Sequence, residues 1–265
     1  MVVIVLATLN ARHAHASLGL RCLRANLGEL RERSEIAEFV LGARAEEVVE
    51  RILASQPRIV GFGVYIWNVE ETTRIGGLLK AVAPGVTVVL GGPEVSHEVE
   101  AQPVCRIADY VVTGWGEVTF AELARQVLRG PPPPEKVHAG AQPPLEAIAL
   151  PYGEFSDDDL RCRNLYVEAS RGCPFKCEFC LSALDRTAWP FPLEAFLQQL
   201  ARLHERGARR FKFVDRTFNL KVDASLAILR FFLDRLAADP ADPPFAHFEL
   251  IPDQLPRRLM EEIAR

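Results

Sequence analysis

The chain has 265 residues, a formal net charge of −4 at pH 7, 49% hydrophobic residues and 25% charged residues. This balance is typical of a soluble protein with a buried core, and without a run of Lys or Arg it argues against a nucleic-acid partner. The apolar segment 1–10 is too short to cross a bilayer and has no basic segment, so we expect a buried strand, a cytoplasmic location and no membrane partner. In a reducing compartment, clustered cysteines favour metal or redox chemistry over disulfides.

Short apolar runs alternate with helical patterns in the first half of the chain. Runs rich in β-branched residues predict five strands, and apolar residues at helical spacing predict helices between them. The strands are expected at 2–8, 35–41, 58–66, 86–92 and 109–114, and the helices at 17–27, 45–55 and 120–130. One more helix is expected after Asn68, whose side chain would cap it with Glu71 as the capping-box partner. The alternation indicates an α/β fold with a doubly wound, flavodoxin-like parallel sheet of the Rossmann type.

Ligands of doubly wound sheets bind beyond the carboxyl ends of the strands. The segments expected at that edge are 9–15, 65–68, 91–94 and 114–117. Glycine in such a position lets the backbone approach a ligand closely, and two glycines follow each of the fourth and fifth predicted strands. We therefore expect a ligand crevice lined by Gly91, Gly92, Gly114 and Gly116.

A run of four prolines, Pro131–Pro134, interrupts this pattern. Proline fits neither a helix interior nor a central strand, so the stretch 131–163, which is rich in Pro, Asp and Gly, is predicted to be a linker. A second β/α series follows the linker. Its strands are expected at 164–172, 209–219 and 245–253, and its helices at 192–207, 224–239 and 255–265.

Three of the six cysteines, Cys173, Cys177 and Cys180, stand together in the sequence RGCPFKCEFC. They could form an apolar stripe on a helix, but a glycine and a proline flank the first cysteine and indicate a loop. A disulfide would leave one thiol over, and a structural zinc site wants a fourth Cys or His, of which none follows until His204. Three thiolates can instead hold three irons of a cubane cluster and leave the fourth iron open to another ligand.

The loop Cys173-Pro-Phe-Lys-Cys177-Glu-Phe-Cys180 follows a predicted strand at the start of a β/α series, and there it resembles the cluster loop of the radical S-adenosylmethionine (SAM) enzymes. The resemblance implies a partial (β/α) radical SAM barrel over the last part of the chain. It also implies a [4Fe–4S] cluster held by the three cysteines, with the amino and carboxylate groups of SAM on the fourth iron. Reduction of the cluster would cleave SAM to methionine and a 5′-deoxyadenosyl radical.

The same resemblance assigns further side chains to SAM. Phe179 would lie near the adenine, with plain loop packing as the alternative. Asp215 and Asn219, in the sequence FVDRTFN, stand where these enzymes place polar contacts to the SAM amino group, although the usual Gly-Gly-Glu is absent. The alternative for Asp215 is a cap on the following turn. Glu249 and Asp253, near the end of the third strand, either face the cofactor or are solvated or capping residues.

A doubly wound domain before such a loop resembles the cobalamin (B12)-binding radical SAM proteins. The resemblance spans essentially the whole chain and is carried by the sequences LNARHAHASLGLRCL, VVLGGPEVS and VVTGWGEVTFAEL. The D-x-H-x-x-G pattern of other cobalamin domains is absent, which implies cobalamin bound without a histidine ligand from the protein. The residues expected to contact cobalamin are His15, Tyr65, Trp67, Gly91, Gly92, Gly114, Gly116 and Glu117.

Simpler interpretations of these residues are also open. His13 and His15 can be polar loop residues at the start of a helix. Tyr65, Trp67 and Trp115 can be rim or core aromatics instead of contacts to the flat corrin ring.

The predicted organisation is a cobalamin-binding-like domain over 1–130, a linker over 131–163 and the first half of a radical SAM domain over 164–265. We expect a cobalamin-dependent radical SAM enzyme that transfers a methyl group to an unactivated centre of its substrate, with an external electron donor of the flavodoxin or ferredoxin type. Because only three strands are predicted after residue 163, we expect a truncation within the barrel, the rest belonging to a longer native chain. The alternatives are a non-catalytic cobalamin- or cluster-binding protein, a fragment without activity of its own, and an electron-transfer or zinc protein.

Overall fold

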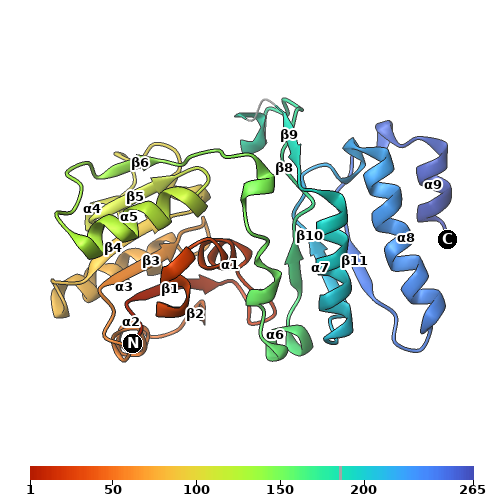
Figure 1. The fold of residues 1–265 in the computed structure, drawn as a ribbon. Helices are drawn as coiled ribbons and strands as arrows, with labels where there is room; N and C mark the ends of the chain where they lie inside the picture. Colours follow the sequence, from red (N-terminus) through yellow and green to blue (C-terminus); the bar gives the residue numbers. More distant parts are fainter. Residues whose placement is uncertain (185–186) are drawn as a thin grey trace. The chain divides into compact units, whose positions relative to one another are not determined.

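The structure, a computed structural model, describes residues 1–184 and 187–265. It separates into two compact units, Met1–Glu154 and Phe155–Arg265, and each unit has its own parallel sheet (Figure 1). No helix in the described part of the chain is long and apolar enough to cross a membrane.

The sheet of the first unit has six strands in the order β2-β1-β3-β4-β5-β6, and every neighbouring pair is parallel. The chain order reverses beside β1, because β2 lies on one side of it and β3 on the other, so the sheet is doubly wound as predicted. The strands are β1 Ile4–Asn10, β2 Ser34–Val40, β3 Ile59–Gly63, β4 Thr87–Gly91, β5 Tyr110–Thr113 and β6 Val137–Ala139.

Helices cover both faces of this sheet. They are α1 Leu18–Ala25, α2 Ala45–Leu53, α3 Val69–Val82, α4 Val104–Ile107 and α5 Glu117–Arg129. Side chains of the central strand β1 point alternately to the two faces. Val5, Ala7 and Leu9 pack in a core with α2, α3 and α4, whereas Ile4 and Leu6 pack in a second core with α1 and α5. All of β1 is buried, which explains why its sequence is mostly apolar instead of alternating.

Residues 131–154 differ from the predicted free linker, because they form part of the first unit. β6 adds a sixth strand beside β5, whereas the sequence predicted five. The Ala149 amide donates to Asn26 Oδ1 over 2.9 Å, and the nearly fully buried carboxylate of Glu154 pairs with Arg24 and Arg31. The strand was missed because its side chains are largely exposed and its main-chain hydrogen bonds leave no apolar pattern.

The second unit contains a parallel sheet in the order β11-β10-β7 and a separate antiparallel pair, β8 and β9. The strands are β7 Leu165–Val167, β8 Ser170–Gly172, β9 Ala188–Pro190, β10 Arg210–Phe213 and β11 Phe245–His247. The helices are α6 Asp157–Cys162, α7 Leu193–Glu205, α8 Val222–Ala238 and α9 Arg257–Ile263. The predicted strand at 164–172 is two strands, β7 and β8, which belong to different sheets.

An aromatic cluster forms the core around β10. The Phe213 ring contacts Phe196 from α7, Phe232 from α8, and Phe218 and Phe248 from the segments after β10 and β11, with ring centroids 4.5 to 6.1 Å apart. Phe218 and Phe248 are themselves 4.0 Å apart. This packing fixes the turn that follows β10, which is the turn that contacts the cysteine segment.

Candidate functional site

All six strands of the first sheet end at the same edge, because parallel strands share their direction, and four of them precede the loops of interest. They are β1, β3, β4 and β5, which end at Asn10, Gly63, Gly91 and Thr113. Every residue that the sequence assigns to a cobalamin contact lies at this edge: Gly91 ends β4, Glu117 begins α5, and the others lie in the loops that follow the strands. Hydrogen bonds and close backbone packing hold these loops in place.

The loop after β4 packs directly on the backbone of the loop after β3. Gly92 has a φ of +113°, and a Cβ at this position would lie 2.5 Å from the Val64 carbonyl oxygen. Both features require glycine here. Ser96 then joins this loop to the next one, since its hydroxyl donates to the Gly92 carbonyl over 2.8 Å and accepts from the Gly114 amide over 3.0 Å.

The loop after β5 leads into α5. Gly114 has a φ of +69° and is exposed, and Gly116 occupies the N-cap position of the helix. Glu117, the first helical residue, is buried with 5% of its surface exposed. A carboxylate in the first turn interacts favourably with the helix dipole. The glycines thus lie at the accessible rim, and Glu117 lies beneath it.

Asn68 does not cap α3, so the prediction of a capping box is wrong. Its side chain makes no capping hydrogen bond and is fully buried. Its Oδ1 accepts from the Tyr65 amide over 2.8 Å, and its Nδ2 donates to the carbonyl oxygens of Leu9 and Gly63 over 3.0 and 3.1 Å. Carbonyl groups in a protein interior need hydrogen-bond donors from the protein. The Asn68 side chain therefore donates to carbonyls at the ends of β1 and β3 instead of capping α3.

We expect Asn68→Ala to lower the free energy of unfolding by about 2–3 kcal/mol, because it removes three hydrogen bonds of a fully buried side chain and takes from the Tyr65 amide the acceptor that it has in Asn68. Urea unfolding followed by circular dichroism measures this change. Glu71→Ala is the matched control, with an expected change within about 0.5 kcal/mol because no capping box exists. Equal effects of the two substitutions would restore the capping-box interpretation.

The loop after β3 exposes apolar side chains. The rings of Tyr65 and Trp67 stack with centroids 4.5 Å apart and planes 7° apart, and the indole nitrogen donates to the Leu9 carbonyl over 3.3 Å. Trp67 remains 45% exposed and Ile66 77% exposed. These residues lie at the rim of the sheet edge and present a flat apolar surface there, and whether they contact a corrin ring stays a prediction.

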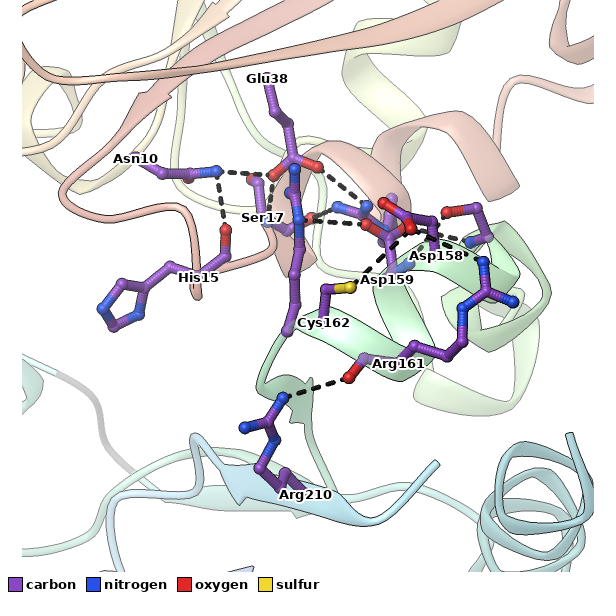
Figure 2. A network of polar contacts seen from close by, with 12 residues as sticks. Asn10, His15, Ser17, Glu38, Asp158, Asp159, Arg161, Cys162 and Arg210 are labelled. Atoms are coloured by element: carbon purple, nitrogen blue, oxygen red, sulfur yellow. Dashed lines mark hydrogen bonds and ion pairs between the residues drawn. The ribbon is translucent and has the colours of Figure 1, made fainter. Parts of the chain in front are cut away.

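A polar network fixes the start of the loop after β1 (Figure 2). The Asn10 side chain donates over 2.9 Å to both the His15 carbonyl oxygen and Glu38 Oε1. The same Glu38 oxygen accepts from the Ser17 amide, and its other oxygen pairs with Arg21 over 2.8 Å. Figure 2 shows the imidazole of His15 pointing away from the Asn10 side chain. The network thus holds the backbone of His15 through its carbonyl oxygen.

In the second unit, the cysteines lie in a loop that β8 and β9 close at its base. The ladder pairs Ser170 with Pro190 and Gly172 with Ala188. Gly172, directly before the first cysteine, has a φ of +83°, and a Cβ there would collide with the Thr187 carbonyl oxygen. Residues 185 and 186 of the loop lie outside the described residues. The ladder and the glycine together fix where the loop begins.

The three cysteines differ in exposure. Cys173 is 7% exposed, Cys180 is half-buried and Cys177 is exposed, and all three are free thiols. Within 1–184 and 187–265, no three Cys, His, Asp or Glu side chains converge on one point that suits a single metal ion. The ligands of a cubane cluster sit on separate irons, so its sulfurs need no common point. A set of three thiols in one loop therefore fits an iron–sulfur cluster in its donor chemistry.

Asp215 holds the segment that leads into the cysteine loop. It follows β10, is 3% exposed, and accepts from the Ala169 amide over 2.9 Å and from the Ser170 hydroxyl over 2.6 Å. Burial raises the pKa of the Asp215 carboxyl, and these two hydrogen bonds act in the opposite direction. These hydrogen bonds hold residues 169 and 170 at Asp215. The strand predicted at 164–172 is therefore interrupted here and forms β7 and β8.

Asn219 uses its side chain on the backbone that follows β11. Its Nδ2 donates to the carbonyl oxygens of Ile251 and Gln254 over 2.8 and 3.0 Å, and its Oδ1 accepts from the Ile251 amide over 2.9 Å. Phe179 is different, because 95% of its surface is exposed between two of the cysteines. The assignment of these residues to SAM stays a prediction.

One residue at this site was missed from the sequence. Thr217 is buried, and its hydroxyl oxygen lies 3.5 Å from the Sγ of Cys173. It stands two positions after Asp215 in the same FVDRTFN segment. A single threonine is not part of any motif. Its position between Asp215 and Asn219, which the sequence assigns to SAM, is the signal that could have identified it.

Comparison with known proteins identifies relatives of both units. Residues 4–124 match the family model described as the B12 binding domain. The chain is 28% identical over 245 residues to an uncharacterised methyltransferase of Pyrococcus horikoshii, a match that covers 82% of this chain and 53% of that protein. It is 29% identical over 167 residues to the cobalamin-dependent radical SAM methyltransferase TokK of Streptomyces tokunonensis, covering 53% of this chain and 24% of TokK.

Two solved structures of the radical SAM methyltransferase TsrM from Kitasatospora setae share the fold of the chain. The one with tryptophan and a SAM analogue bound has a TM-score of 0.72 at 18% identity and covers 99% of this chain and 57% of TsrM. The one with cobalamin and a [4Fe–4S] cluster bound has a TM-score of 0.71 at 18% identity. The matched region thus spans about half the length of TsrM and of the Pyrococcus protein, and less of TokK.

Proposed function

We propose that this chain holds cobalamin in its first unit and a [4Fe–4S] cluster with SAM in its second. The proposal is supported by the match of residues 4–124 to the B12 binding domain model and by the similarity of the chain to cobalamin-dependent radical SAM methyltransferases. The proposed reaction class is methyl transfer to an unactivated centre of the substrate. The observation that carries the proposal is the loop with Cys173, Cys177 and Cys180, which β8 and β9 close at its base.

The carboxyl edge of the first sheet fits a large flat ligand. Asn68 and Ser96 bind the loops after β3, β4 and β5 to fixed backbone groups, so the edge is organised before any ligand arrives. The glycine backbone at the rim allows close approach, and the half-exposed ring of Trp67 offers apolar surface that a ligand would bury. These residues suit contact with a corrin ring, and His15, in the loop after β1, is proposed as a further contact.

The cysteine loop fits a cluster with one open iron. Three thiolates would hold three irons, and SAM would complete the fourth. When bound, cobalamin would supply methyl-transfer chemistry and the cluster would supply the electron that cleaves SAM. Phe179, exposed between Cys177 and Cys180, is proposed to contact the adenine.

Two polar residues of the second unit have different proposed roles. Asp215, a buried carboxylate beside the start of the cysteine loop, is proposed to accept from the SAM amino group. Asn219 has both amide hydrogens on backbone carbonyls, so it is proposed to shape the SAM site instead of donating to SAM. An external donor of the flavodoxin or ferredoxin type would deliver the electron.

Anaerobic reconstitution of the chain with iron, sulfide and cobalamin tests the proposal. After gel filtration we expect stoichiometric cobalamin by its visible spectrum and about four iron atoms per chain by chemical analysis. Retention of cobalamin without iron would support a cobalamin carrier instead. Retention of neither cofactor would contradict the proposed function.

A further inference from the structure

We propose that Thr217 is a positioning residue for the first cluster ligand: its hydroxyl donates a hydrogen bond to the sulfur of Cys173 and raises the reduction potential of the cluster. This inference rests on the proposed function, because it concerns the cluster that the cysteine loop would hold. It adds a residue outside the cysteine loop and a property, the potential, that the loop sequence does not specify.

Binding of iron by Cys173 would give the hydrogen bond one direction. The two atoms lie 3.5 Å apart, within the range for a hydrogen bond to sulfur. In the free thiol either atom can be the donor. A cysteine that binds iron is a thiolate and has no proton, so only the hydroxyl of Thr217 can then donate.

Burial makes this hydrogen bond hard to replace. Cys173 is 7% exposed and Thr217 is 6% exposed, so bulk water has little access to either atom. Cys177, by contrast, is exposed and its sulfur is open to water. Removing the Thr217 hydroxyl would therefore take from the Cys173 sulfur a donor that bulk water cannot readily replace. A hydrogen bond in a buried site is also electrostatically stronger than one in water.

The backbone on both sides of Thr217 is fixed. Asp215, two residues before it, binds the start of β8 through Ala169 and Ser170. Phe218, directly after it, donates its amide to the Glu249 carbonyl over 2.8 Å and packs its ring against Phe248. The hydroxyl therefore cannot follow the sulfur if the loop shifts, and it marks one position for the Cys173 ligand.

The hydrogen bond favours the reduced form of the cluster. Reduction adds negative charge to the cluster and its sulfurs, and a donor aimed at a sulfur stabilises that charge. Thr217→Val keeps the shape of the side chain and removes the donor. We expect it to lower the equilibrium constant for reduction by roughly tenfold, which for one electron is a potential about 59 mV more negative.

A redox titration of the reconstituted chain, followed by its visible absorption under argon, tests the inference. Thr217→Ser is the matched control, because it retains the hydroxyl, and its potential should equal that of the wild type. Iron content should stay near the wild-type value in both variants. If the valine variant does not fold, as judged by circular dichroism, Thr217→Ala removes the same donor with less steric change.

Two outcomes would overturn the inference, and they are distinguishable from failure of the proposed function. A valine or alanine variant with four irons and the wild-type potential would show that the hydroxyl does not affect the cluster. A serine variant shifted as far as the valine variant would show an effect of side-chain size. A wild-type chain that binds no iron would contradict the proposed function itself and this inference with it.

Discussion

Replacing Cys177 by alanine is expected to abolish cluster binding. The reconstituted Cys177→Ala chain should hold less than about one iron atom, against about four in the wild type, because two thiolates cannot retain a cubane whose fourth iron has no protein ligand. Cys177 is the exposed member of the three cysteines, so its replacement creates no cavity and should leave the fold intact. Iron analysis and the absorption band near 400 nm measure the loss.

The chain contains a matched control for this substitution. Cys162 is also an exposed free thiol, but it ends α6 and lies outside the loop that β8 and β9 close. Cys162→Ala should retain the full iron content and the wild-type spectrum. An unchanged iron content in Cys177→Ala, or an equal loss in both variants, would contradict the assignment of the cysteine loop as the cluster site.

Replacing Gly92 by alanine is expected to disrupt the ligand edge of the first unit. The φ of +113° lies in a region that residues other than glycine rarely adopt, and the added Cβ would lie 2.5 Å from the Val64 carbonyl oxygen and 3.0 Å from its amide nitrogen. Together these should cost about 3 kcal/mol of unfolding free energy. Cobalamin affinity should fall about tenfold or more, which is at least about 1.4 kcal/mol, because the loop after β4 must move away from the loop after β3.

Gly77 provides the control for Gly92. It lies inside α3, and a Cβ there meets nothing within 4 Å. Gly77→Ala should therefore stabilise the chain by up to about 1 kcal/mol, because alanine favours the helix, and should leave cobalamin affinity unchanged. Urea unfolding and a cobalamin titration of both variants measure the two effects. A Gly92→Ala chain with wild-type stability and affinity would contradict the role given to this loop.

Elements with a strong local signal were predictable from the sequence. The run of apolar residues in β1 predicts a strand, and the structure shows it buried on both faces. The spacing of Cys173, Cys177 and Cys180 predicts a thiolate site, which stays a prediction. The glycine pair at the end of β4 predicts a close approach of the backbone to a ligand, and contact with a ligand stays a prediction; what the structure shows at Gly92 is close packing on Val64. In each case residues adjacent in the sequence carry the whole pattern.

Features that depend on contacts distant in the sequence were not predictable. Asn68 before a helix looks like a cap, and only the fold brings it to the ends of β1 and β3. Thr217 is an ordinary loop residue until β10 and β8 bring it to Cys173, 44 positions away. β6 follows a run of four prolines, and its side chains are largely exposed, so it has no apolar pattern in the sequence. Its main chain pairs with β5, which only the fold brings beside it.

The most direct test of the account is reductive cleavage of SAM. The reconstituted wild-type chain, reduced with dithionite under argon in the presence of SAM, should release 5′-deoxyadenosine and methionine, detected by liquid chromatography and mass spectrometry. The Cys177→Ala chain should release neither product, and the Cys162→Ala chain should match the wild type. A wild-type chain that holds four irons and cobalamin but forms no 5′-deoxyadenosine above the Cys177→Ala background would contradict the assignment of the second unit to radical SAM chemistry.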